Sequence, residues 1–473
     1  MYLIQVIICS FCFVVFANSS PTRILVSCDR NGFTCKTIDS KRHILYQCPP
    51  KTQDVLINLW NYGEPSNTAW VTVKNCATVE IDMSCTSYRR SFESLTIENV
   101  TNLHFTRSVT TMKNPAKIYL RDIENIPLIP ENTFTIPHMM KYNGPVVEHE
   151  VQGIEFESVN IGTIETHAFH GLRGFRNFTW KNVNVELVHP KAITINFNTT
   201  EKYQGWFSMT NSTMTILDYL SFQLHVKEAI FENNKFVEIM PGGISGTIEN
   251  FTYVDNIVDM LQPGSISILA KTVNIFANTF NYLKAGSLSK ISPGLLTDSH
   301  TSFGNLEFGY KFNNNNIVYM DAGSLNPDMV AYKKVSTNLY FTFNNFFCTC
   351  ENMGWLISPN GHGSSTTSLK SFYESITNET ASNICSGLTC KMTIASLKYF
   401  FKNGQCISNF TMEDFCQITT TSQTSTFEVD SIGESDIWYN RSEPKSDGNS
   451  NFSYYYIISF SVMLNMFSLK FVL

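Results

Sequence analysis

Charged residues are few in this chain, and neither sign dominates. They make up 16% of the 473 residues, with 34 lysines and arginines against 40 aspartates and glutamates. The sequence therefore lacks the basic field that would attract nucleic acid. It also lacks the G-x-S-x-G motif of many hydrolases and the G-x-x-x-x-G-K loop that binds phosphate. These absences predict a protein that is not an enzyme, uses no cofactor and binds no nucleic acid.

Histidines and paired acids offer two catalytic alternatives, and neither completes a motif. His167 and His170 lie three residues apart, but near a turn where exposed polar residues are expected, so we predict no metal there. Glu155 and Glu157 would stand on one face of a strand, as the two carboxylates of a glycosidase do. A solvated acidic face is the simpler interpretation of that pair.

Cysteines are missing from residue 86 to residue 347 and gather on both sides of this gap. Clustered cysteines form disulfides in an oxidising compartment, whereas in the cytosol they more often bind metal. Their spacing leaves the connectivity open. The amino-terminal candidates are Cys28, Cys35, Cys48, Cys76 and Cys85, and the carboxy-terminal ones are Cys348, Cys350, Cys385, Cys390, Cys406 and Cys416.

The amino-terminal end indicates passage through the secretory pathway. Residues 1–17 form an apolar, almost uncharged run followed by small residues, which is typical of a signal peptide. Removing it also removes Cys9 and Cys12 and leaves an odd number of cysteines. Asn-x-Ser/Thr acceptors agree with secretion. They are Asn99, Asn177, Asn198, Asn211, Asn250, Asn378, Asn409, Asn440 and Asn451.

The carboxy-terminal end predicts a membrane attachment. A Ser/Thr-rich stalk at 419–451 precedes an apolar tail at 452–473, and no basic cluster follows the tail to fix a membrane span. A glycosylphosphatidylinositol (GPI) signal needs small residues before such a tail, and Ser446, Gly448 and Asn449 supply them. We expect a GPI-anchored protein on the extracellular face of the plasma membrane. A single membrane span and a freely secreted chain are the alternatives.

An internal repeat organises the cysteine-free region. Apolar residues recur at offsets 0, 2, 7, 10 and 15, often with Asn at offset 5. The pattern begins at Ile154, Phe178, Phe207, Ala229, Phe251, Val273 and Tyr310, and one unit reads Ala229, Phe231, Asn234, Phe236, Ile239 and Ile244.

The offsets of the repeat predict a stack of coils. Offsets 0 and 2 place two apolar side chains on one face of a short strand, and such strands can stack side by side. The Asn can satisfy backbone groups where the chain turns. Offsets 7, 10 and 15 return apolar side chains to the core from an irregular back. No coil buries its apolar face alone, so the ends of the stack need caps.

The repeat pattern ends at a pair of cysteines. It continues through Leu339, Phe341, Asn344 and Phe346, after which Cys348 and Cys350 replace the returning half of the coil and Trp355 follows. This L-x-F-x-x-N-x-F-x-C-x-C pattern resembles the carboxy-terminal cap of extracellular leucine-rich-repeat proteins, and the units resemble degenerate leucine-rich repeats.

The resemblance implies a solenoid with a parallel β-sheet on its concave face, an irregular convex side and disulfide-stabilised ends. The repeats would occupy residues 91–346 and the cap 347–418, after an amino-terminal region or cap at 18–90. It also implies that the cap pair bonds to cysteines chosen from Cys385, Cys390, Cys406 and Cys416. A right-handed parallel β-helix, an architecture that includes polysaccharide-cleaving enzymes, is the alternative fold.

The same register predicts a surface for partners. Offsets −1, 1 and 3 would face solvent, which clusters Ile230, Val254 and Phe276 as a candidate partner-binding patch. A small rotation of the coils, or the loop at 290–305 folding over the patch, would instead bury it. Asn177 and Asn250 fall at offset −1, where glycans would restrict access to the sheet.

The resemblance implies a cell-surface glycoprotein that binds an extracellular or cell-surface protein, in adhesion or as a receptor-type recognition module. A secreted structural protein of the extracellular matrix and a β-helix carbohydrate-active enzyme are the alternatives.

Overall fold

The computed structural model divides the chain into two compact units, and every residue that it describes lies in the first, Met1–Thr421. No helix in the described part of the chain is long and apolar enough to cross a membrane. The described residues are 22–25, 33–38, 41–49, 54–58, 69–82, 94–107, 117–134, 153–173, 177–196, 205–294, 307–335, 337–357, 367–387, 390, 392–399, 401–402, 405–406 and 416.

Several sequence predictions fall outside these residues. The signal peptide, the stalk and the apolar tail are among them. So are Cys28, Cys85, Asn198, Asn409, Asn440, Asn451, Ser446, Gly448 and Asn449.

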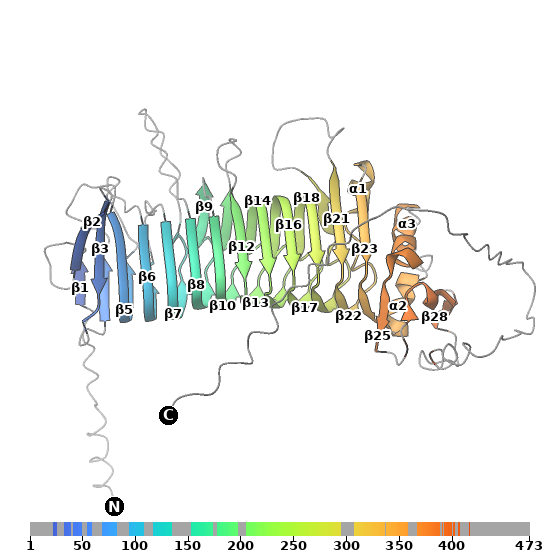
Figure 1. The fold of residues 1–473 in the computed structure, drawn as a ribbon, viewed down its shortest axis with the longest axis horizontal. Helices are drawn as coiled ribbons and strands as arrows, with labels where there is room; N and C mark the ends of the chain where they lie inside the picture. The colour runs from blue at the N-terminus through green and yellow to red at the C-terminus, as the bar shows by residue number, and fades with distance from the viewer. Residues whose placement is uncertain are drawn as a thin grey trace, which may run out of the picture. The chain divides into compact units, whose positions relative to one another are not determined.

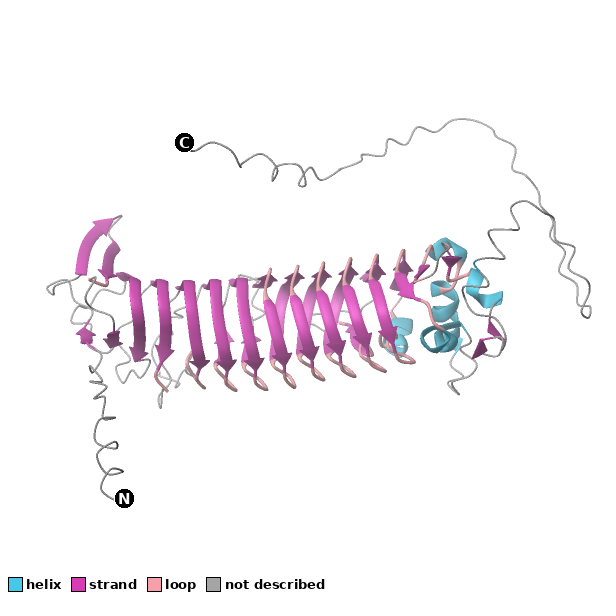
Figure 2. Cartoon of the chain, turned by 90° about the horizontal axis from the view of Figure 1, so that it is seen from below, coloured by secondary structure: helices cyan, strands magenta, loops and turns pink. Residues whose placement is uncertain are grey.

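The described strands stack as coils of one largely parallel sheet (Figure 1). In the regular part, β14 (Phe222–Glu232), β16 (Ile244–Val254) and β18 (Ile266–Phe276) pair in parallel, and each coil is 22 residues after the last. The first half of β14 pairs with one strand of the preceding coil and its second half with another. One long strand therefore bends across two faces of the stack, and a third face follows it. Figure 2 shows the long strands lying side by side.

We name the three faces A, B and C. Face A carries offsets −1 to 3. Its strands are β3 (Lys41–Gln47), the first parts of β5 (Ala69–Asp82), β6 (Ser94–Phe105), β7 (Lys117–Ile129), β8 (Gly153–Ile164) and β10 (Asn177–Val188), then β12 (Trp206–Thr210), the second parts of β14, β16 and β18, then β21 (Phe308–Asn313) and β23 (Thr337–Thr342).

Face B follows face A along each coil, and face C completes the regular coils. Face B holds β4 (Asp54–Asn58), the second parts of β5 to β8 and β10, and β13 (Thr213–Leu217), β15 (Lys235–Ile239), β17 (Ile257–Leu261), β19 (Thr279–Leu283), β22 (Asn316–Met320), β24 (Asn345–Phe347) and β25 (Ile384–Ser386). Face C holds β9 (Phe169–Arg173), β11 (Ile193–Asn196), the first parts of β14, β16 and β18, and β20 (Lys290–Pro293).

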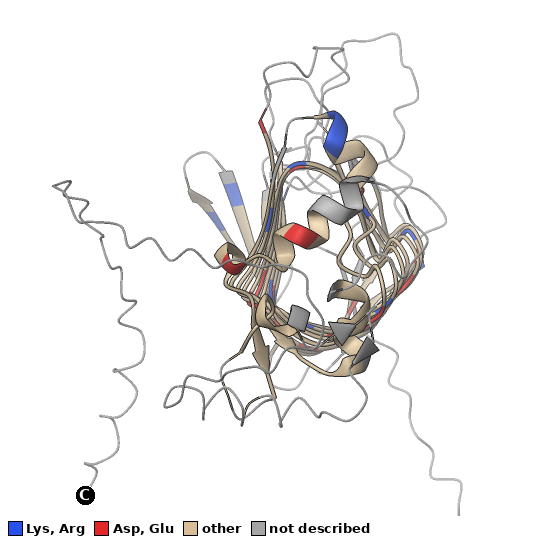
Figure 3. Cartoon of the chain, turned by 90° about the vertical axis from the view of Figure 1, so that its right-hand side faces the viewer, with Lys and Arg blue, Asp and Glu red and all other residues tan. Residues whose placement is uncertain are grey.

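The coils wind around a common centre, as the view along the stack shows (Figure 3), and the core consists of the side chains buried between the faces. The side chains at offsets 0 and 2 are buried, for example those of Phe251 and Tyr253. Aromatic rings continue from coil to coil: Tyr253 stacks on Phe280 at 6.5 Å between centroids, and Phe280 on Phe312 at 5.9 Å. Burying such rings against neighbouring coils is the main force that holds a solenoid together.

The offset-5 asparagines form a buried ladder between faces A and B. Asn234, Asn256, Asn278, Asn315 and Asn344 each donate through Nδ2 to Oδ1 of the asparagine in the next coil, at 3.0–3.1 Å. Each also donates to a strand carbonyl of the preceding coil and accepts a backbone N–H there, as Asn256 does with Phe231 and Asn234. The prediction that this Asn satisfies backbone groups is confirmed, but the bonds run between coils.

The unusual backbone angles lie one residue before the ladder. Asn211, Asn233, Asp255, Asn314 and others at offset 4 have positive φ, between 51° and 55° for these four. Asn and Asp tolerate this left-handed conformation better than most residues. The corner residue therefore makes the turn, and the ladder residue fills the space inside it.

The prediction of an irregular back is wrong for the regular coils, because face B and face C are built of strands too. The inward residues of face B lie at offsets 7 and 10, as Val258 and Leu261 do in β17. A spacing of three breaks the two-residue alternation of a regular strand, so the pattern indicated irregular chain. The backbone nevertheless pairs in parallel with β15 and β19. The coils are thus compatible with a parallel β-helix as well as with other solenoids.

Helices and disulfides close the carboxy-terminal end of the stack. The helices are α1 (Met329–Lys334), α2 (Cys350–Ile357) and α3 (Thr367–Ile376), with short helical turns at Glu379–Ala381 and Ser396–Tyr399. Trp355 is buried and packs edge-to-face on Tyr373 at 5.7 Å. Cys348 bonds to Cys385 and Cys390 to Cys416, while Cys350 is also disulfide-bonded. Short strands complete the cap: β26 (Met392–Thr393), β27 (Phe401–Lys402) and β28 (Gln405–Cys406).

At the other end, β1 (Thr22–Leu25) pairs with β4, and β2 (Phe33–Ile38) pairs antiparallel with β3. Cys48 bonds to Cys76, and Cys35 is disulfide-bonded. Disulfides at both ends indicate an extracellular or secreted chain.

Candidate partner-binding face

Face A presents three rows of outward side chains whose alignment the strand pairing fixes. Offset 3 aligns Thr210, Glu232, Val254, Phe276 and Asn313 on successive coils. This is the register that the repeat predicts. The solvent-facing rows of the sheet are therefore known residue by residue.

The predicted patch is brought together as expected. Val254 and Phe276 are direct partners across β16 and β18, whereas Ile230 pairs with Thr252 and so lies diagonally to Val254. Phe276 is 36% exposed, and Ile230 and Val254 are half-buried. The chain segment at 295–306 lies outside the described residues, and it contains most of the loop considered as a cover.

Two exposed aromatic residues lie nearer the cap, beyond the coil that carries Lys311 and Asn313, and sequence reasoning missed both. Tyr340, at offset 1 of the unit that starts at Leu339, is 45% exposed, and Phe343, at its offset-4 corner, is 59% exposed. Phe343 has a φ of 59°, which costs a bulky residue about 1–3 kcal/mol. Neither burial nor backbone preference explains a phenylalanine there. We call Ile230, Val254, Phe276, Tyr340 and Phe343 together the apolar strip.

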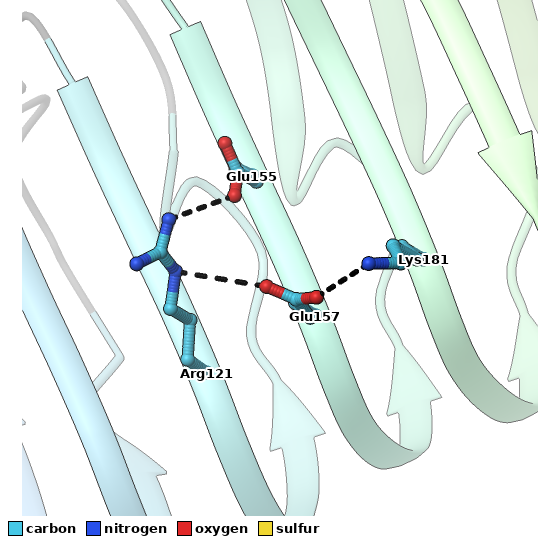
Figure 4. Close-up of polar contacts among 4 residues, drawn as sticks. All are labelled: Arg121, Glu155, Glu157 and Lys181. Carbon is cyan, nitrogen blue, oxygen red and sulfur yellow. Dashed lines mark hydrogen bonds and ion pairs between the residues drawn. The ribbon is translucent and has the colours of Figure 1, made fainter.

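The amino-terminal part of face A is charged instead (Figure 4). Arg121 on β7 donates to Glu155 on β8 at 2.9 Å and lies 3.9 Å from Glu157, which accepts a 2.7 Å hydrogen bond from Lys181 on β10. Opposite charges thus alternate across three coils. These ion pairs link neighbouring strands and make this end of face A hydrophilic.

The same contacts bear on the idea of a glycosidase pair. The Lys181 hydrogen bond holds the pKa of the Glu157 carboxyl below its usual value. A general acid of a glycosidase needs a raised pKa, so that it keeps a proton to donate. Glu155 is engaged by Arg121. This pair is therefore suited to ion pairing and not to acid catalysis.

His167 and His170 lie together at a corner of the early coils. Their rings are 4.7 Å apart, and His167 Nδ1 lies 3.7 Å from a carboxylate oxygen of Glu131. Within the described residues no group of three or more histidine, cysteine, aspartate or glutamate side chains has a geometry that could hold a metal ion.

The described glycosylation acceptors gather around face A. Asn177 and Asn250 lie in its offset −1 row, where Asn177 packs over Gly153 and Asn250 accepts from Thr272 at 2.7 Å. Asn99 and Asn211 occupy offset-4 corners, and Asn378 lies in the cap. Asn250 shares β16 with Val254, and Asn211 follows the strand that pairs with Ile230, so glycans at these two positions would border the apolar strip.

A hollow opens at the corner beside the strip. Its volume is about 700 Å³, and it is lined by Thr210, Asn211, Glu232, Asn233 and Asp255. The lining spans three coils, since Thr210 pairs with Glu232 and Asp255 belongs to the next coil. Every lining residue is polar.

Comparison with known proteins adds no relative. No protein-family model, curated protein or solved structure matches this chain.

Proposed function

We propose that this chain is a cell-surface binding module that recognises an extracellular protein through the apolar strip of face A. The observation that carries the proposal is the pairing of Val254 with Phe276 on a solvent-facing sheet row, with the Phe276 ring more than a third exposed. Exposed aromatic groups on a rigid surface are typical anchors of protein interfaces. Phe343 supports the same reading, because its strained and exposed position is explained by a contact with a partner.

The rigidity of the scaffold suits a binding role. The asparagine ladder and the strand pairing fix each side chain of the strip relative to its neighbours. A preorganised surface loses little conformational freedom when it binds, which favours affinity. The charged rows around Arg121 keep the remaining surface soluble.

The family proposal rests on the cap. The C-x-C pair, the buried Trp355 and the Cys348–Cys385 bond fit the cap of extracellular leucine-rich-repeat proteins, which supports placing the chain near that class. Strands on all three faces support the parallel β-helix as the alternative architecture. Either solenoid can present face A to a partner.

The proposal includes a GPI anchor, which the sequence at Ser446, Gly448 and Asn449 supports. The full chain is expressed in animal cells, which are then treated with phosphatidylinositol-specific phospholipase C. Release into the medium supports the anchor. Retention in the membrane pellet supports a membrane span, and protein in untreated medium supports a secreted matrix protein.

Binding is tested on the same cells. Cells that display the full chain are mixed with a panel of cells that lack it, and adhesion is counted under gentle flow. We expect at least one cell type to adhere, and phospholipase treatment to abolish its adhesion. Display without adhesion to any cell or to purified matrix would contradict the proposed function.

A further inference from the structure

We infer that the corner hollow is the seat of the first N-acetylglucosamine of a glycan attached to Asn211. Asn211, Ser212 and Thr213 form an acceptor sequence, and the acceptor side chain itself lines the hollow. The inference requires the secretory route that the disulfides indicate, and it does not depend on the identity of the partner.

The geometry places the attachment atom at the hollow. Asn211 has a φ of 51°, and its Oδ1 accepts a hydrogen bond of 2.6 Å from Nδ2 of Asn233 in the next coil. This bond uses the oxygen of the amide, whereas a glycan is joined to the nitrogen. Backbone hydrogen bonds from Asn211 to Glu232 and from Asn233 to Val254 fix the two corners relative to each other.

The lining suits a sugar in its chemistry. The hydroxyls of N-acetylglucosamine donate and accept hydrogen bonds, and its acetamido group does both. Carboxylates of Glu232 and Asp255 can accept from hydroxyls, and the Asn233 amide and the Thr210 hydroxyl offer both donors and acceptors.

The covalent step is the ordinary one of the secretory pathway. The donor is an oligosaccharide joined to a lipid pyrophosphate. Nδ2 of Asn211 loses one proton and forms a bond to C1 of the first sugar, while the bond between C1 and the pyrophosphate oxygen breaks. The lipid pyrophosphate leaves with the bonding electrons, the proton from Nδ2 passes to a base of the glycosylating enzyme and from there to solvent, and nothing is oxidised or reduced.

A glycan bound in the hollow would also limit the directions from which a partner can reach the apolar strip. Glu232 pairs directly with Val254, so a sugar in the hollow borders the apolar strip at its amino-terminal end. A partner of the strip would have to approach from the cap side, over Phe276 and Tyr340.

The experiment uses the full chain from animal cells. A glycopeptide map first measures occupancy at Asn211 and at Asn99, which occupies the same kind of corner with a φ of 53°. Peptide-N-glycosidase then acts on the native protein, and release is followed at each acceptor. We expect release from Asn211 to be about five-fold slower than from Asn99, with equal rates after denaturation. An unoccupied Asn211, or equal native rates, would overturn the inference.

Two variants distinguish binding of the sugar in the hollow from general steric crowding around Asn211. Asp255→Gly removes a lining side chain and keeps the positive φ of 53° accessible. It should speed release from Asn211 towards the Asn99 rate, whereas Glu238→Gln on face B should leave the rate unchanged. If Asp255→Gly leaves the release rate at Asn211 unchanged, the hollow does not hold the first sugar.

The variant Asn211→Gln tests whether the hollow instead binds a saccharide that belongs to another molecule. Free N,N′-diacetylchitobiose is titrated into this variant and binding is followed by calorimetry. Weak or absent binding by the variant, together with a slowly released glycan in the unaltered protein, supports the attached sugar. Binding of the free disaccharide, combined with an unoccupied Asn211 in the unaltered chain, would assign the hollow to a saccharide of another molecule.

Discussion

Asn256 donates to Oδ1 of Asn278 at 3.0 Å through its side chain and at 2.9 Å through its backbone N–H. One buried amide oxygen thus satisfies two donors of the preceding coil. Repeated along the stack, this relationship ties the corner of each coil to the next. It explains how a chain with few charged residues keeps its coils aligned.

Asn256→Ala should therefore be strongly destabilising. The change leaves the N–H of Asn234 and the carbonyl of Phe231 without their buried partner. Buried unsatisfied groups cost about 1–3 kcal/mol each, so we expect the free energy of unfolding to fall by about 3 kcal/mol or more. Denaturant unfolding measures it. Thr252→Ala, on the solvent-facing row of the same coil, should change it by less than about 0.5 kcal/mol.

If both variants unfold at the same denaturant concentration, the ladder does not hold the coils together. A loss confined to the slope of the transition would indicate that the stack no longer unfolds as one unit.

Trp355→Ala tests the carboxy-terminal cap. The ring is 7% exposed and packs on Tyr373, so its removal should cost about 3–5 kcal/mol, as for other large core truncations. Trp206→Ala is the matched control, because that ring on face A is 43% exposed. An unchanged thermal midpoint for Trp355→Ala would show that the cap does not stabilise the last coils.

His225 on face C predicts a pH dependence of stability. Burial lowers the pKa of this imidazole in the folded protein, and its strand neighbours Asn196 and Thr247 do not titrate. Above the unfolded pKa, about 6.5, both states hold a neutral ring and His225 contributes no pH dependence. As the pH falls below that value, the unfolded state binds the proton first and unfolding becomes easier.

The thermal midpoint should accordingly decrease as the pH is lowered from 7.5 to 5.5, and His225→Gln should make this decrease smaller. Carboxylates titrate at lower pH and are present in both the unaltered chain and the variant, so they do not account for a difference between the two. An identical fall in the unaltered chain and in the variant would show that His225 does not carry the effect.

The sequence predicted the register well in the middle coils because successive units there start 22 residues apart. With 22 residues between Phe251 and Val273, counting offsets places Val254 beside Phe276, as the strand pairing confirms. Counting fails where coils differ in length. Arg121 and Glu155 are 34 residues apart, a longer separation than the 22-residue spacing of the regular coils, so their contact was not predicted.

Other features were missed because the pattern of apolar residues does not encode them. Strands on face B carry inward residues three apart, which a two-residue alternation does not detect. The positive φ of Phe343 is a property of the corner and of its hydrogen bond to Ala381, and an aromatic side chain gives no sequence signal for it. The hollow at Asn211 depends on residues from three coils brought together by folding.

The most direct test of the binding role compares Phe276→Asp with Leu269→Asp on cells that display the full chain. Both side chains are exposed, at 36% and 46%, but Phe276 lies on face A and Leu269 on face C, on the same strand β18. With equal surface display, we predict that Phe276→Asp loses at least about 90% of adhesion, because it places a charge at the centre of the proposed contact. Leu269→Asp should adhere as the unaltered chain does. Equal adhesion by both variants and the unaltered chain would contradict the assignment of the apolar strip.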